Sequence, residues 1–109
     1  MFELIFSETI NNDIVSALKY IKEILKAPIA AENHYNELRN IYKKLKENPY
    51  IRPLVHNKFL ASKGIRFIMI KNYMLIYIIN ENDNMVLLYR FMYSKRDWIN
   101  ILTNEFENE

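Results

Sequence analysis

The sequence contains no cysteine, one glycine and only two histidines among its 109 residues. Without cysteine, the chain forms no disulfide and offers no thiolate for zinc binding or nucleophilic catalysis. A metal site would have to combine carboxylates with His34 and His56, so we expect neither a metal nor a cofactor. Three prolines, a single glycine and no low-complexity segment indicate an ordered globular chain.

Long apolar stretches are also missing. The longest apolar run, "YMLIYII" at 73–79, is far shorter than a membrane-spanning helix. The opening residues "MFELIFSETINND" lack the basic start and the extended apolar core of a signal peptide. We therefore expect no membrane association and a cytoplasmic location. The length predicts a single domain over residues 1–109.

The chain has little excess charge of either sign, with a net charge of only +2. Its positive and negative residues are nevertheless unevenly distributed along the sequence. Residues 1–38 carry three lysines and six carboxylates, whereas residues 43–71 carry eight basic residues and one carboxylate. This asymmetry points to a basic face for a polyanion or an acidic partner. The alternative, in which the lysines only solubilise a helix end and a loop, is equally compatible with the sequence.

Two helices are expected in the first half of the chain. A short apolar run at 2–6 is typical of a strand, and Ser7 after it can cap a helix whose apolar residues recur at helical spacing over 10–25. Pro28 is well placed to begin a second helix, which "ENP" at 47–49 ends. The short break between the helices predicts an antiparallel helical hairpin.

Three β-rich runs follow a proline-containing loop at 49–64 that has room for a turn of helix. These runs are 65–70, 73–80 and 85–93. Only "KN" separates the first two, and Asn72 tolerates positive φ, so the runs predict an antiparallel meander with a tight first turn. In the middle run both alternating sets are apolar. That pattern suits a central strand covered on both faces, or a sheet with one face reserved for a partner.

A last helix is expected after Ser94, which with Asp97 resembles a capping box; Asp97 is thus better explained as a capping residue than as a catalytic acid. The fold class is therefore α+β. We predict an N-terminal strand, an antiparallel helical hairpin, a three-strand antiparallel meander and a C-terminal helix. The hairpin should cover one face of the sheet, and the open face should carry Arg66, Arg90 and Tyr93.

The segment "RFMYSKRDW" at 90–98 raises the question of a site. Arg90 lies inside an apolar strand, where a charge must face solvent, a partner or a ligand. It either contacts a ligand or pairs with Glu3 or another carboxylate across the sheet. The cluster contains no histidine, the residue best suited to proton transfer at neutral pH, and this weakens an enzymatic interpretation. His56, in the basic loop, is a minor candidate for that role.

The chemistry of the basic cluster suits a phosphate backbone. Arginine binds phosphate bidentately, and tyrosine stacks on bases. We therefore predict a site that cleaves or binds nucleic acid without metal. The candidate catalytic residues are Arg66, Arg90 and Tyr93, and the candidate nucleic-acid-binding residues are Lys63, Lys71, Lys95 and Arg96. A chance grouping of such residues at the end of a β-strand remains the alternative.

The order of elements, with "GIRFIMIKNYMLIYII" and "VLLYRFMYSKRDW", resembles the RelE/ParE toxin superfamily of bacterial type II toxin–antitoxin and plasmid stabilisation systems. The similarity extends over nearly the whole chain. Lys95, Arg96 and Asp97 match the basic pair and acid of the family ending. Met74 stands where the family often has arginine, and Tyr93 stands where histidine is common.

The resemblance implies a toxin with a cognate antitoxin, acidic and partly disordered when free, that folds over it through an amphipathic helix or an added strand. It also implies one of two targets. Ribosome-dependent mRNA cleavage by a metal-independent endoribonuclease (an mRNA interferase) is favoured by the basic cluster, although no general base is identifiable. The alternatives are ParE-like inhibition of DNA gyrase without nuclease activity, and a non-toxic module that binds an acidic protein.

Overall fold

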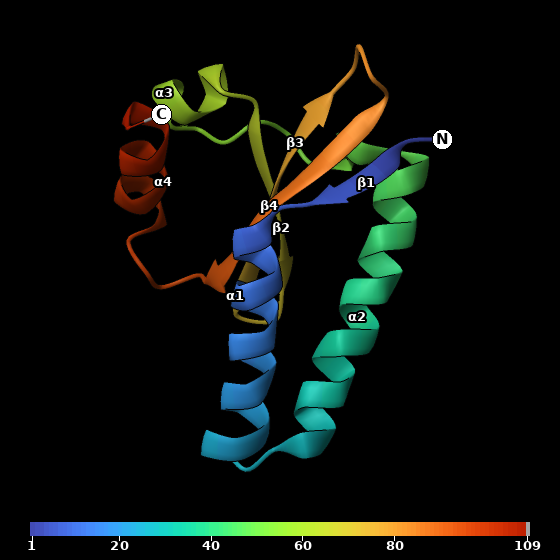
Figure 1. The fold of residues 1–109 in the computed structure, drawn as a ribbon, viewed down its shortest axis with the longest axis vertical. Helices are drawn as coiled ribbons and strands as arrows, with labels where there is room; N and C mark the ends of the chain where they lie inside the picture. The colour runs from blue at the N-terminus through green and yellow to red at the C-terminus, as the bar shows by residue number, and fades with distance from the viewer. Residues whose placement is uncertain (109) are drawn as a thin grey trace.

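A four-stranded sheet in the order β1-β4-β3-β2 organises residues 1–108, the part of the chain that the computed structural model describes (Figure 1). Its strands are β1 (Glu3–Phe6), β2 (Ile65–Ile70), β3 (Tyr73–Asn80) and β4 (Met85–Tyr93). The last three form the predicted antiparallel meander, and their bounds match the three apolar runs of the sequence. β1 completes the sheet by pairing with β4 in parallel.

The predicted helical hairpin is present, with an irregularity at its tip. Its helices are α1 (Glu8–Lys19), extended by a π-helical segment η1 (Tyr20–Ile24), and α2 (Pro28–Glu47); they run side by side in Figure 1. Ser7 caps α1 as expected, because its Oγ accepts a hydrogen bond from the Ile10 N–H at 3.0 Å. In η1 the Leu25 N–H donates to the Tyr20 carbonyl at 3.1 Å, the i→i+5 bond that defines a π-turn.

Within residues 1–108 both faces of the sheet are covered, so the open face expected from the sequence is absent there. On one side, the hairpin face, Leu38 of α2 and Leu88 of β4 belong to a core shared with α1. On the other side, the α4 face, Met74 and Leu102 belong to a second core. That face is covered by α3 (Lys58–Ser62) and α4 (Trp98–Glu107). The apolar pattern on both sides of β3 thus reflects burial in two cores.

Connections differ from the sequence expectation in two details. In the β2–β3 turn the positive φ of 56° belongs to Lys71, and Asn72 takes none. The N-cap of α4 is Asp97, whose Oδ1 accepts from the Asn100 N–H at 3.4 Å, so Ser94 lies before the helix instead of capping it. The loop after α2 contains the expected helical turns, α3 and the 3-10 segment η2 (Pro49–Ile51). In residues 1–108 no helix has the length and apolarity needed to span a bilayer.

Candidate functional site

Arg90, the sharpest candidate from the sequence, is buried in an ion-pair network. It is 9% exposed, and its Nε donates to Asp13 Oδ2 at 2.7 Å while Nη2 donates to Asp13 Oδ1 at 3.2 Å. Nη1 donates to Glu105 Oε2 at 2.5 Å. One cation therefore meets two carboxylates, one from α1 and one from α4. The carboxylate interpretation of Arg90 is the one that the structure bears out, with Asp13 and Glu105 as partners in place of Glu3.

The end of β1 explains why this network forms. β1 pairs with β4 only as far as Phe6 opposite Leu88, so the last residues of β4 have no strand on that side. Asp13 replaces the missing strand, since its Oδ2 also accepts from the Phe91 N–H at 3.0 Å. Nearby, Ser7 Oγ donates to the Tyr89 carbonyl at 2.7 Å. Side chains from the start of α1 thus satisfy this free edge of the sheet.

The network also fixes the charge of Arg90. Burial by itself lowers the pKa of the guanidinium, but the hydrogen bond and charge of Asp13 and the charge of Glu105 outweigh it, so the pKa of Arg90 is raised. Glu105 is further oriented by the Tyr89 hydroxyl, which donates to its Oε1 at 2.9 Å. The arrangement ties α1, β4 and α4 together through charge-assisted hydrogen bonds.

Arg66 lies on the other face of the sheet from Arg90. It pairs across the ladder with Tyr77, a hairpin-face residue, whereas Arg90 pairs with Ile76 on the α4 face. The Nη1 of Arg66 donates to the Arg52 carbonyl at 2.6 Å, and its guanidinium lies 5.4 Å from the centre of the Tyr50 ring. These contacts hold the loop after α2 against β2.

Tyr93 lies at the far end of the sheet from Arg66. It pairs with Tyr73 at the start of β3, four residues or about 13 Å from Tyr77, the ladder partner of Arg66. The three candidate catalytic residues are therefore not brought together. Tyr93 is 39% exposed and lines a pocket of about 850 Å³, called here the tyrosine pocket. Its lining includes Tyr20, His34, Lys71, Tyr73, Tyr93 and Arg96, over a floor that contains Ile21.

The rings of Tyr20, His34, Tyr73 and Tyr93 line the tyrosine pocket. Tyr73 stacks on Phe91 with centroids 5.0 Å apart and meets His34 and Tyr93 edge to face at 5.9 and 5.8 Å. Burial, followed by the electrostatic influence of Tyr20 and Tyr93, raises the pKa of Tyr73. His34 Nδ1 lies 2.8 Å from the Ala30 carbonyl, which can only accept, so Nδ1 carries a proton and, in the neutral ring, Nε2 is the nitrogen with the lone pair.

The fold places the four candidate nucleic-acid-binding residues in different parts of the surface. Lys71 and Arg96 line the tyrosine pocket, are exposed, and take part in no ion pair within residues 1–108. Lys63 lies 5.4 Å from the centre of the Phe59 ring at the end of α3, on the α4 side. Lys95 is exposed and does not line the pocket.

His34 and Tyr20 belong to the site but were not among its predicted residues. His34 lies on α2 among packing positions, and Tyr20 is the first residue of the π-helical segment that follows α1. The available signal was the small residues Ala30 and Ala27, which precede His34 by four and seven residues and line the same pocket. His56, the minor candidate, is exposed in the loop before α3.

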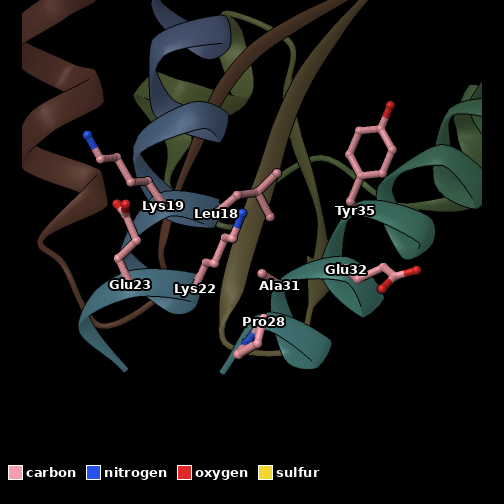
Figure 2. Close-up of a pocket in the computed structure, with 8 residues that line it drawn as sticks. All are labelled: Leu18, Lys19, Lys22, Glu23, Pro28, Ala31, Glu32 and Tyr35. Carbon is pink, nitrogen blue, oxygen red and sulfur yellow. The ribbon is translucent and has the colours of Figure 1, made fainter. Parts of the chain in front are cut away.

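A second groove lies between the two helices of the hairpin and has different chemistry. Figure 2 shows it between α1–η1 and α2, with a volume of about 560 Å³. Lys19 and Lys22 line it together with Glu23 and Glu32, so its charges balance. Residues 1–108 also contain no group of three or more histidines or carboxylates able to hold a metal ion. The tyrosine pocket is therefore the stronger candidate for an anionic ligand.

Two solved structures with this fold come from toxin–antitoxin systems. A chain of the chromosomal ParDE system of Pseudomonas aeruginosa superposes with a TM-score of 0.66 and 13% identity, covering 87% of this chain and 98% of that one. A chain of the RelBE2 complex of Mycobacterium tuberculosis superposes with a TM-score of 0.60 and 14% identity, covering 84% and 96%. At such identities the likeness establishes the fold alone. No curated protein matches the sequence.

The fold is thus that of the RelE/ParE-like toxins: a helical hairpin inserted between a first strand and a three-strand meander, followed by a C-terminal helix. The family model described as the ParE toxin of the type II toxin–antitoxin system parDE matches residues 4–98. The chain belongs to this family and is a toxin of the type II class.

Proposed function

We propose that this toxin arrests bacterial growth as a ParE-type inhibitor of DNA gyrase and has no RNA-cleaving site. The observation that carries the proposal is the double carboxylate partnership of Arg90, the arginine on which a cleavage site would most depend. Membership of the ParE family agrees with it. The basic cluster of the sequence favoured mRNA cleavage, and the ion pairs of Arg90 argue against it.

Electrostatics is the reason for the reversal. Cleavage of a phosphodiester needs preorganised positive charge at the atoms where negative charge develops. Asp13 and Glu105 give the Arg90 group a formal net charge of −1, which repels a phosphate. Arg66 is on the opposite face and contacts the Arg52 carbonyl, so it does not compensate. Inhibition by protein binding requires no such charge cluster.

We also propose a cognate antitoxin as the partner that neutralises the toxin. The two structures described above are of toxin–antitoxin systems, and this chain offers two surfaces suited to such a partner. β1 is an edge strand with Ile5 and Phe6 each 40% exposed, so an added strand can pair with it. The basic segment 43–71 complements an acidic chain.

Ribosome-dependent mRNA cleavage is the second candidate, favoured by one observation. Tyr93, Lys71 and Arg96, three residues of the predicted nucleic-acid site, all line the tyrosine pocket. His34 in the same pocket has a free Nε2 able to accept a proton from a ribose hydroxyl. In this alternative the site lies on the hairpin face, without Arg66 and Arg90.

Induction of the toxin in a bacterial host distinguishes the two, with translation, mRNA 5′ ends and DNA breaks measured separately. The proposal expects DNA damage signalling with intact mRNA, and inhibition of purified gyrase in a supercoiling assay. Rapid loss of translation with new 5′ ends inside codons would overturn it in favour of cleavage. Harmless expression of the folded chain would instead indicate a non-toxic interaction module.

Substitution of His34 distinguishes gyrase inhibition from mRNA cleavage more directly. His34→Gln retains a polar side chain in the pocket but removes the only histidine there. The gyrase proposal expects full growth arrest by His34→Gln, because no proton transfer is involved. The cleavage candidate expects a loss of arrest that His56→Gln, an exposed histidine outside the pocket, does not reproduce.

A further inference from the structure

We infer that the tyrosine pocket binds a nucleotide, with one base between its aromatic rings and the attached phosphate at its basic rim. The inference goes beyond gyrase inhibition and does not depend on it, because binding is a property of the purified chain alone. It rests on the shape, the charge and the polar atoms of the pocket.

The shape fits a small planar ligand. A volume of about 850 Å³ lies within the range of small-molecule sites, roughly 300–1,000 Å³. The rings of Tyr20, His34, Tyr73 and Tyr93 come from the hairpin tip, α2, β3 and β4, so they surround the space from several sides. Aromatic walls of this kind hold a base by stacking, which tolerates any of the common bases.

The charge fits a phosphate. Lys71 projects from the β2–β3 turn and Arg96 from the loop after β4, and both are exposed and outside any ion pair of residues 1–108. None of the eleven residues that line the pocket is acidic. The groove of Figure 2 is the internal contrast, because Glu23 and Glu32 offset its two lysines. A guanidinium binds two phosphate oxygens at once, and an ammonium adds a point charge.

The remaining polar atoms fit a base edge. The Tyr73 hydroxyl stays protonated at neutral pH, since burial and then the neighbouring tyrosines raise its pKa. It is therefore a neutral donor and acceptor, and in the neutral form of the His34 ring Nε2 is an acceptor. Neutral groups of both kinds suit the mixed donor and acceptor edge of a base. The same chemistry is offered by a free mononucleotide and by one unstacked nucleotide of a single strand.

The binding test uses purified toxin and isothermal titration calorimetry with AMP, adenosine, inorganic phosphate and a single-stranded oligoadenylate of six nucleotides, called the hexanucleotide below. AMP is expected to bind more tightly than adenosine or phosphate, because base and phosphate contacts add. A hexanucleotide that binds at least about tenfold more tightly than AMP identifies a single strand as the source. Equal affinity for AMP and the hexanucleotide identifies a free nucleotide.

Matched variants locate the site. Lys71→Ala with Arg96→Ala is expected to weaken AMP binding at least about tenfold, since two charge-assisted contacts are lost. Lys43→Ala with Lys44→Ala removes the same charge from the exposed side of α2 and should leave affinity unchanged. Tyr93→Leu should weaken binding, whereas Tyr35→Leu, an exposed tyrosine outside the pocket, should not.

Two outcomes would overturn the inference. Absence of AMP and hexanucleotide binding by the folded wild-type chain removes it, and so does equal weakening by the pocket and control variants. Binding of a peptide such as Asp-Trp-Glu in place of AMP would assign the pocket to a protein partner. Gyrase inhibition is measured separately by supercoiling, so either proposal can fail without the other.

Discussion

Two groups of basic side chains near the end of β4 have opposite surroundings. Arg90 is enclosed by Asp13 and Glu105, while Lys71 and Arg96 stand at the rim of a pocket without acidic residues. In the sequence, Arg90 and Arg96 belong to one basic cluster. The fold assigns the first to stability and leaves the second available to a ligand, so the position of carboxylates, and not the number of cations, defines the candidate site.

Removing Arg90 should have the largest effect on stability. Arg90→Ala leaves two carboxylates without their cation and is expected to lower the free energy of unfolding by about 3 kcal/mol. Urea denaturation measures this loss. Arg96→Ala is the matched control and should change stability by no more than about 0.5 kcal/mol. Equal stability of the two variants would remove the distinction between the groups. Any toxicity lost with Arg90→Ala would accordingly reflect the fold.

Removing the carboxylate charges as well should restore part of that loss. Asp13→Asn keeps an oxygen that can accept from the Phe91 N–H, and Glu105→Gln keeps an acceptor for the Tyr89 hydroxyl. In the Arg90→Met background these two changes should recover about 1–2 kcal/mol, because no uncompensated buried charge remains. The same urea titrations test it. No recovery would indicate that geometry, and not charge, dominates the network.

Lys71 contrasts with Arg90, because its backbone conformation lowers the stability of the fold. Its φ of 56° is unfavourable for a side chain with a Cβ but acceptable for glycine. Lys71→Gly is therefore expected to raise the free energy of unfolding by about 0.5–1 kcal/mol while weakening nucleotide binding. Thermal unfolding and calorimetry measure the two effects. A variant that loses stability would show that Lys71 has structural contacts comparable to those of Arg90.

The smallest effect on stability concerns the ionisation of Tyr42, which is partly buried against the core on the hairpin face. Burial, followed by the influence of Tyr35, raises the pKa of Tyr42 to about 12 from 10.0. Its stabilising contribution is complete below pH 10 and is lost as pH rises from 10 to 12, since the unfolded chain releases this proton first. Urea unfolding at pH 9 and 11 should show a smaller decline for Tyr42→Phe than for the wild type. Identical declines would exclude this contribution.

Much of the fold could be predicted because it depends on local patterns. The three apolar runs give β2, β3 and β4 with their observed bounds, and the short break before Pro28 gives the hairpin. The α4 cap was misplaced because Ser94 and Asp97 both suit a cap in sequence. In the structure the Ser94 N–H donates to the Asn72 carbonyl at 2.8 Å, which keeps Ser94 in the turn beside β3.

The candidate site could be predicted only in part because it depends on distant contacts. Asp13 is 77 residues from Arg90, and nothing near Arg90 in the sequence indicates that pairing. A register shift beside Ile76 and Tyr77 also places Arg66 and Arg90 on opposite faces, which simple strand alternation does not foretell. Lys71, Tyr93 and Arg96 were identified because basic and aromatic side chains suit a nucleic-acid site, and all three line the tyrosine pocket.

The pairing of β1 with β4 bears on when the chain becomes a toxin during its own synthesis. The first strand, Glu3–Phe6, pairs with Met85–Tyr93. Asp13 pairs with Arg90, which belongs to the same partner strand. Neither contact can form until residues 85–93 have left the ribosome. The sheet therefore closes only after β4 has been made. Before that point both edges of β1 lack a strand partner, whereas in the folded sheet only the edge away from β4 is left to pair with an added strand.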